Sequence, residues 1–174
     1  QGRIANPFKK IRLDLKKIYY GSYMLEITGE MTAEREQSTA VYRLLYDALS
    51  LLQETSEPEK VARWFESKML HSLGYLLHTS ACVSCRAPYL SGRPAAMSFR
   101  LGGVLCPKCS LKHENPPVAS RASLDVLDFL RQLEPACLDT FALPGAVARE
   151  LGALSESYIT HITGRALRTS RFLK

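Results

Sequence analysis

Residues 82–109 read CVSCRAPYLSGRPAAMSFRLGGVLCPKC, a stretch with two C-x-x-C pairs separated by twenty residues. Each pair places two sulfur atoms on one tight turn, and two such turns can surround a single ion with four thiolates. This spacing predicts one structural Zn²⁺ ion in a closed tetrahedral site. The predicted ligands are Cys82, Cys85, Cys106 and Cys109.

Other uses of paired cysteines fit the chain less well. A disulfide framework is typical of small secreted domains, but this sequence shows no signal-peptide pattern and has a fifth cysteine, Cys137. A thioredoxin-like pair needs a β-α-β unit, and a zinc deaminase needs Pro before its C-x-x-C motif, where this chain has Leu105. A catalytic zinc ion would keep one coordination position open, which four cysteines close. We expect Cys137 to be a small buried apolar residue.

The segments on either side of this stretch have helical periodicity, with apolar residues every three or four positions. Helices are expected over residues 6–27, after Ser38 or Thr39, from Pro58 to about residue 77, after Ser120 or Ser123, and from Pro144 to about residue 162. Strand-like patterns are weak outside residues 97–101 and Val104. We therefore predict a mainly α fold, a helical bundle with an inserted four-cysteine zinc-binding module.

This pattern also predicts the organisation of the chain, whose 174 residues suffice for one main core. The helical domain is expected to comprise residues 6–78 and 119–174. Residues 79–118 are expected to form the zinc-binding module, called the insertion below.

The charge of the chain is unevenly distributed, although its net value is only +6. Residues 1–17, 82–113 and 161–174 together contain 15 Lys and Arg residues and one Asp, whereas the remainder contains 8 basic and 16 acidic residues. Separate basic surfaces are typical of polyanion-binding proteins, although solvated basic faces and charge compensation at a thiolate site would give the same pattern. The candidate contacts to nucleic acid or an acidic partner are Lys9, Lys10, Arg12, Lys16, Arg100, Arg165, Arg168 and Arg171.

Several classes of function are disfavoured by what the sequence lacks. It contains no G-x-S-x-G nucleophile motif, no phosphate-binding G-x-x-x-x-G-K-[ST] motif and no dinucleotide-binding G-x-G-x-x-G motif. No apolar run approaches the ~20 residues that span a bilayer, so we expect no membrane association. These observations favour a binding protein over an enzyme.

Three segments, in this order, resemble the bacterial DNA repair and recombination mediator family RecO. Residues 64–77 read WFESKMLHSLGYLL, residues 98–109 read SFRLGGVLCPKC, and residues 158–173 read YITHITGRALRTSRFL. The resemblance extends from about Phe8 to the end of the chain. It covers the helical and zinc-binding region of the family, whose N-terminal OB-fold has no counterpart here; residues 1–5 are expected to be its last remnant.

The resemblance implies a non-enzymatic role in recombinational DNA repair. Members of this family bind single- and double-stranded DNA, promote strand annealing, and act with RecR in the RecFOR pathway to load RecA. They also dock the acidic C-terminal tail of single-stranded DNA-binding protein. The four cysteines match the family's zinc positions, and a bacterial cytoplasmic, nucleoid-associated location is implied. The alternative from a different class is a helical protein–protein adaptor with a purely structural zinc site and no DNA binding of its own.

Overall fold

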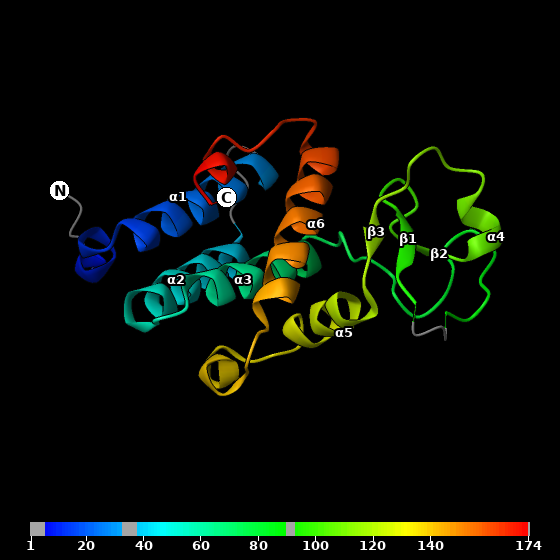
Figure 1. The fold of residues 1–174 in the computed structure, drawn as a ribbon. Coiled ribbons are helices and arrows are strands. Elements are labelled where there is room, and N and C mark those ends of the chain that lie inside the picture. Colours follow the sequence, from blue (N-terminus) through cyan, green and yellow to red (C-terminus); the bar gives the residue numbers. More distant parts are fainter. Residues whose placement is uncertain (1–5, 33–37, 90–92, 174) are drawn as a thin grey trace.

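The computed structural model describes residues 6–32, 38–89 and 93–173, and it confirms a mainly helical fold with a small sheet (Figure 1). Its α-helices are α1 (Leu15–Met31), α2 (Thr39–Glu54), α3 (Pro58–Ser72), α4 (Pro107–Ser110), α5 (Arg121–Leu130) and α6 (Gly145–Thr163). Its 3₁₀ helices are η1 (Lys9–Leu13), η2 (Pro135–Thr140) and η3 (Thr169–Phe172). Its strands are β1 (Ala95–Ser98), β2 (Gly103–Leu105) and β3 (Val118–Ala119). The predicted remnant, residues 1–5, lies outside the described residues.

The first predicted helix is in fact two elements. Phe8 precedes η1 with a φ of 47°, η1 ends at Leu13, and the extended backbone of Asp14 separates η1 from α1. The Asp14 carboxylate accepts hydrogen bonds from the backbone N–H groups of Lys16 and Lys17, at 2.8 and 3.2 Å, so it caps α1. The continuous helix predicted over residues 6–27 was therefore wrong, because Asp14 satisfies the first turn of a new helix.

Three other helix boundaries agree closely with the pattern, but α3 ends at Ser72 rather than at the predicted residue 77, and Gly74 follows it with a positive φ of 80°. Ser38 caps α2 through the backbone N–H of Val41, and Ser120 caps α5 through that of Ser123. Gly164 ends α6 in the left-handed conformation, with a φ of 67°. Local side-chain chemistry thus sets these ends, which is why the sequence predicts them well.

Helix α3 lies at the centre of the bundle and contacts α1, α2, α5 and α6 (Figure 1). Its polar side chains bind carbonyl groups beyond the end of α5 and along its last turn. The ammonium group of Lys60 donates to the Phe141 carbonyl at 3.1 Å, and the Trp64 indole N–H donates to the Leu133 carbonyl at 2.9 Å. Ser67 donates to the Leu127 carbonyl at 3.1 Å. Residues 60, 64 and 67 lie on one face of α3 because they are spaced by about one helical turn. This face therefore binds α5 and the segment that follows it.

A buried ion pair occupies a second face of α3. The guanidinium of Arg63 lies 2.7 Å from the carboxylate of Glu66, and the two side chains are 6% and 0% exposed. Burial raises the pKa of Glu66, and Arg63 opposes that rise. A Cβ atom at Gly152 of α6 would lie 1.7 Å from the Arg63 guanidinium, so any larger residue there would displace Arg63. The ion pair therefore fixes the approach of α6 to α3.

The insertion contains a three-stranded antiparallel sheet in the order β2-β1-β3. Strand β1 ends at Ser98, earlier than the predicted residues 97–101, because Phe99–Gly102 form the turn into β2. Gly102 supplies the positive φ of 72° that this turn requires. Gly103 lies against the backbone of His78, where a Cβ atom would be 2.4 Å from the His78 carbonyl oxygen. This close approach ties the insertion to the segment that follows α3.

The C-terminal segment returns to pack along α1 (Figure 1). The Glu26 carboxylate of α1 accepts hydrogen bonds from the backbone N–H groups of Arg168 and Thr169, at 2.8 and 2.9 Å, and also from the Thr169 hydroxyl. Leu167, in the same C-terminal segment, is buried. Burial raises the pKa of Glu26, but these hydrogen bonds outweigh burial and leave it below its ordinary value. Within the described residues, no helix is long and apolar enough to cross a membrane.

Replacing Gly152 with alanine should strongly destabilise the protein, because the new methyl group would displace Arg63 and leave Glu66 buried without its partner. Separating a buried ion pair costs ~3–5 kcal/mol, measurable as a lower free energy of unfolding in urea. Gly29→Ala is the matched control, since nothing lies within 4 Å of a Cβ atom there. That change should be neutral or stabilising, and an equal loss in both variants would contradict this role for Gly152.

Replacing Glu26 with alanine should release the C-terminal segment and make trypsin cleave after Arg165 and Arg168 several-fold faster. Because folding lowers the pKa of Glu26, its carboxylate stabilises the folded protein at any pH above its unfolded-state pKa of ~4.3. This stabilisation is lost as the pH falls through the lower pKa of the folded state. The difference in melting temperature between wild type and Glu26→Ala should therefore shrink below about pH 4. A difference that grew with acidification would contradict the assignment.

Candidate metal centre and nucleic-acid interface

The four predicted metal ligands come together in the structure. Their sulfur atoms all lie within 4.8 Å of one another, and the Sγ atoms of Cys85 and Cys106 are 3.7 Å apart. All are free thiols, without a disulfide between them. This arrangement fits a metal ion held by four cysteines, and thiolate ligands favour Zn²⁺ among the common metals.

Each pair is positioned by a local turn. In the first turn, the Cys82 N–H donates to the Ala87 carbonyl and the Arg86 N–H donates to the Cys82 carbonyl, both at 2.8 Å. Arg86 closes this turn with a φ of 63°. In the second, Cys106 is the N-cap residue of α4, which begins with Pro107. Both turns expose backbone N–H groups toward the sulfur atoms, as thiolate sites require.

The environment of the thiols supports a bound cation. Burial raises the pKa of Cys82, but backbone N–H groups of Cys106, Cys85 and Ser84 outweigh it and lower the pKa to about 6. The pKa of Cys85 rises to about 11, because its backbone hydrogen bond is outweighed by the three neighbouring thiols. Four crowded thiols cannot all ionise unless a cation offsets their charge.

Beneath the cluster, Cys82 and Cys109 pack with Leu105 in a small core of their own, separate from that of the bundle. Such a small core gives little stability without a metal ion or a disulfide. Cys137, expected to be buried, is instead exposed in η2. Its neighbour Leu138 takes the buried position.

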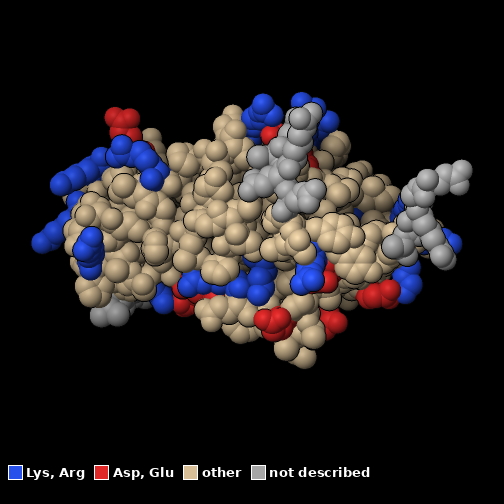
Figure 2. Space-filling view, turned by 180° about the vertical axis from the view of Figure 1, so that it is seen from behind, with Lys and Arg blue, Asp and Glu red and all other residues tan. Residues whose placement is uncertain are grey.

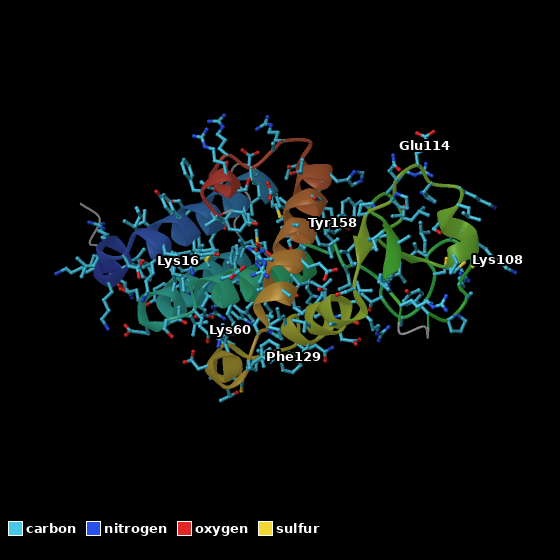
Figure 3. The ribbon with its side chains drawn as sticks, in the orientation of Figure 1. Lys16, Lys60, Lys108, Glu114, Phe129 and Tyr158 are labelled. Carbon is cyan, nitrogen blue, oxygen red and sulfur yellow. The ribbon has the colours of Figure 1, made fainter. Side chains whose placement is uncertain are left out.

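The N-terminal candidates lie at one end of the bundle on η1 and the start of α1. Lys9 and Arg12 are exposed on η1, whereas Lys10 is paired with Glu54 of α2 at 2.8 Å. Lys16 is exposed on the first turn of α1 (Figure 3). Lys10 is therefore less available to a ligand than the other three.

The C-terminal candidates lie on a segment that is not a continuous helix, because α6 ends at Thr163 and η3 begins at Thr169. Arg165, Arg168 and Arg171 are all exposed on it, and Arg165 lies 3.4 Å from Glu30 of α1. Figure 2 shows Lys and Arg atoms gathered over this segment and, separately, over the insertion. The three arginines thus lie exposed on one short segment, although this segment is not a continuous helix.

An aromatic pair lies within this basic surface. The Phe172 ring stacks on that of Tyr19 of α1, with centroids 5.2 Å apart and planes 8° apart, and Phe172 is 48% exposed. The Arg171 guanidinium lies 4.7 Å from the Phe172 centroid. Sequence reasoning missed this pair, since it joins residues far apart in the chain. We call the tail surface the set Tyr19, Arg165, Arg168, Arg171 and Phe172.

Arg100 lies apart from the tail surface, in the turn between β1 and β2 of the insertion. It is exposed and borders a cleft between the insertion and the bundle. The eight predicted basic contacts are therefore divided among three places: the N-terminal end of the bundle, the tail surface and this turn.

Comparison with known proteins finds the same family over nearly the whole chain. The profile of the family described as "Recombination protein O C terminal" matches residues 12–171. The chain is 32% identical to the DNA repair protein RecO of Symbiobacterium thermophilum, over 99% of this chain and 69% of that protein. It is 28% identical to the RecO protein of Halalkalibacterium halodurans and 30% identical to that of Desulforamulus reducens, in each case over 99% of this chain and 67% of the relative. The chain thus spans about two thirds of the length of these relatives.

The thiol cluster predicts that the protein binds one equivalent of Co²⁺ or Zn²⁺, with Co²⁺ giving the absorption of a tetrahedral thiolate site. Cys106→Ser should abolish that absorption, and Cys137→Ser, on η2, should leave it unchanged. Chelation should unfold the insertion while the far-ultraviolet signal of the bundle helices largely persists. Loss of all helical signal on chelation would contradict this and make the metal essential to the whole fold.

Proposed function

The chain belongs to the recombination protein O family of DNA repair proteins, and on this premise we propose that it binds DNA directly through the tail surface. The observation that carries the proposal is the presence of three exposed arginines, Arg165, Arg168 and Arg171, on the short segment that packs along α1. Two acidic residues, Glu26 and Glu30, lie beneath this face, but both already accept hydrogen bonds from the segment itself. Arg168 and Arg171 therefore remain available to a ligand, whereas Arg165 is paired with Glu30.

Such a surface suits recognition of the phosphate backbone. Arginine and lysine side chains neutralise phosphates whatever the base sequence, and they release condensed counterions in doing so. A protein that assists annealing of complementary strands must hold single and double strands without reading sequence. Phe172 is 48% exposed, stacks on Tyr19 and lies under the Arg171 guanidinium, so it adds apolar contact area beside the basic side chains. We therefore propose binding to both single- and double-stranded DNA and an annealing role at the nucleoid.

A non-enzymatic mechanism is part of the same proposal. The cluster of thiols has four donors for one ion, which leaves no open position for a substrate or an activated water molecule. We propose that the metal is Zn²⁺ and that its role is structural, holding the insertion on the bundle. The protein then acts by bringing strands and partners together rather than by altering bonds.

We also propose that the protein contacts partners of the repair pathway. These are RecR, the acidic C-terminal tail of single-stranded DNA-binding protein, and RecA, which is loaded with the help of RecR. Next to Arg12 and Lys16, the side chains of Leu13 and Leu15 are 86% and 63% exposed. Exposed apolar groups bordered by positive charge suit an acidic peptide with an apolar anchor. This observation also favours the second candidate, a helical adaptor that docks proteins and does not bind DNA.

Salt dependence separates these candidates. Anisotropy of labelled single-stranded DNA should give a log affinity that falls steeply and linearly with log salt. Arg168→Ala and Arg171→Ala should each weaken binding and reduce the slope by about 1. Arg121→Ala is the matched control, since Arg121 is paired with Asp125 on α5, away from the tail surface. An adaptor would show no DNA binding at low salt, and its peptide docking would depend on salt only weakly.

A further inference from the structure

A cleft of about 460 Å³ lies where the insertion meets the helical bundle. Three segments line it: the loop after α3, the turn between β1 and β2, and the last turns of α6. Figure 3 shows Tyr158 of α6 facing the insertion across this junction. We call it the junction cleft, and its lining includes Tyr75, His78, Phe99, Arg100, Tyr158 and His161.

The junction cleft has donors and a positive charge but no acid. None of its eleven lining residues is Asp or Glu, although the chain as a whole has 17 acidic residues. Arg100, His78 and His161 are all exposed at its rim. The Arg100 guanidinium has five N–H donors and suits a phosphate group, which it can bind through two parallel hydrogen bonds.

The cleft also has aromatic walls. The Phe99 ring lies 5.1 Å from that of Tyr158 and 5.9 Å from that of His161, measured between centroids. This packing holds Phe99 in place from the bundle side. Tyr75, on the loop after α3, is 40% exposed and stacks on no other aromatic ring of the described residues. Its ring is therefore available to stack on a flat group.

We infer that the junction cleft binds one unpaired nucleotide of single-stranded nucleic acid, with Arg100 on the phosphate and Tyr75 on the base. This inference rests on the proposal that the chain binds DNA, and it assigns a second contact distinct from the tail surface. Ring faces of bases are accessible only in unpaired strands, and the cleft is of ligand-pocket size, too small for a duplex.

The partial charges at two helix ends favour one orientation of the nucleotide in the cleft. Helices α3 and α6 end on the bundle side of the cleft, where their terminal carbonyl groups carry partial negative charge. A phosphate is therefore disfavoured there and favoured beside Arg100, on the insertion side. The uncharged base lies with Tyr75 on the bundle side.

The wall that carries Arg100 is fixed by the insertion. The His78 N–H donates to the Gly102 carbonyl at 2.8 Å, and the Val104 N–H donates to the His78 carbonyl at 2.9 Å. Val83, between the first two cysteines, donates its N–H to the Val104 carbonyl at 2.9 Å. The first cysteine turn is thus hydrogen-bonded to the strand that follows the Arg100 turn, so a folded insertion sets the shape of the cleft.

The experiment compares two single-stranded probes of equal length, oligothymidylate and an abasic strand with the same phosphates. Tyr75→Ala should weaken binding of oligothymidylate by roughly 5-fold or more and leave binding of the abasic strand unchanged. Arg100→Ala should weaken both and reduce the salt slope by about 1. Lys108→Ala is the matched control for charge, since Lys108 lies at the far end of the insertion from α6 (Figure 3).

The possible results separate this inference from the proposed function. If Arg168→Ala weakens both probes but Tyr75→Ala changes neither, or changes both equally, the cleft assignment is wrong and the tail surface remains. If wild-type protein binds neither probe at low salt, both proposals are overturned. Unchanged metal stoichiometry and helical signal in Tyr75→Ala establish that the variant is folded, which its exposed position leads us to expect.

Discussion

The buried ion pair between Arg63 and Glu66 is the constraint on which the bundle depends. Neither charge can remain in the core without the other, because removing a partner leaves an uncompensated ion away from water. The pair lies on the central helix and reaches α6 at Gly152, where a larger residue would displace Arg63. It therefore sets the place of α6, whose last turns form one wall of the junction cleft and lead into the tail surface.

The thiol cluster has the corresponding role at the end of the insertion, where only a small core of Cys82, Leu105 and Cys109 supports the cysteine turns. Its two cysteine turns hold β2, and β2 is hydrogen-bonded to His78 beyond α3. One buried ion pair and one candidate metal site thus orient two parts of the chain, and the two proposed binding surfaces lie on elements that these features fix. We interpret the protein as a rigid support for flexible arginine and lysine side chains, which suits contact with a phosphate backbone.

Much of this was predictable from the sequence, for physical reasons. The thiol cluster was predictable because C-x-x-C spacing brings sulfur atoms together locally. The helix caps at Ser38, Ser120 and Gly164 were predictable as well. Features that depend on contacts between residues far apart in the sequence were not predictable. The Tyr19–Phe172 stack, the Glu26 contacts to the C-terminal segment and the space that Gly152 leaves for Arg63 leave no local pattern. The break at Asp14 was missed because apolar periodicity continues across it.

The most direct test of the account is hydrogen–deuterium exchange of the metal-loaded protein with and without oligothymidylate. The account predicts slower exchange in residues 165–173, on the α1 turns beneath them and in the turn at residues 99–103. Exposed amides of α2 and α5, which carry neither surface, should be unaffected. Protection confined to α2 and α5, or no protection at saturating oligonucleotide, would contradict the claim that the tail surface and the junction cleft contact DNA.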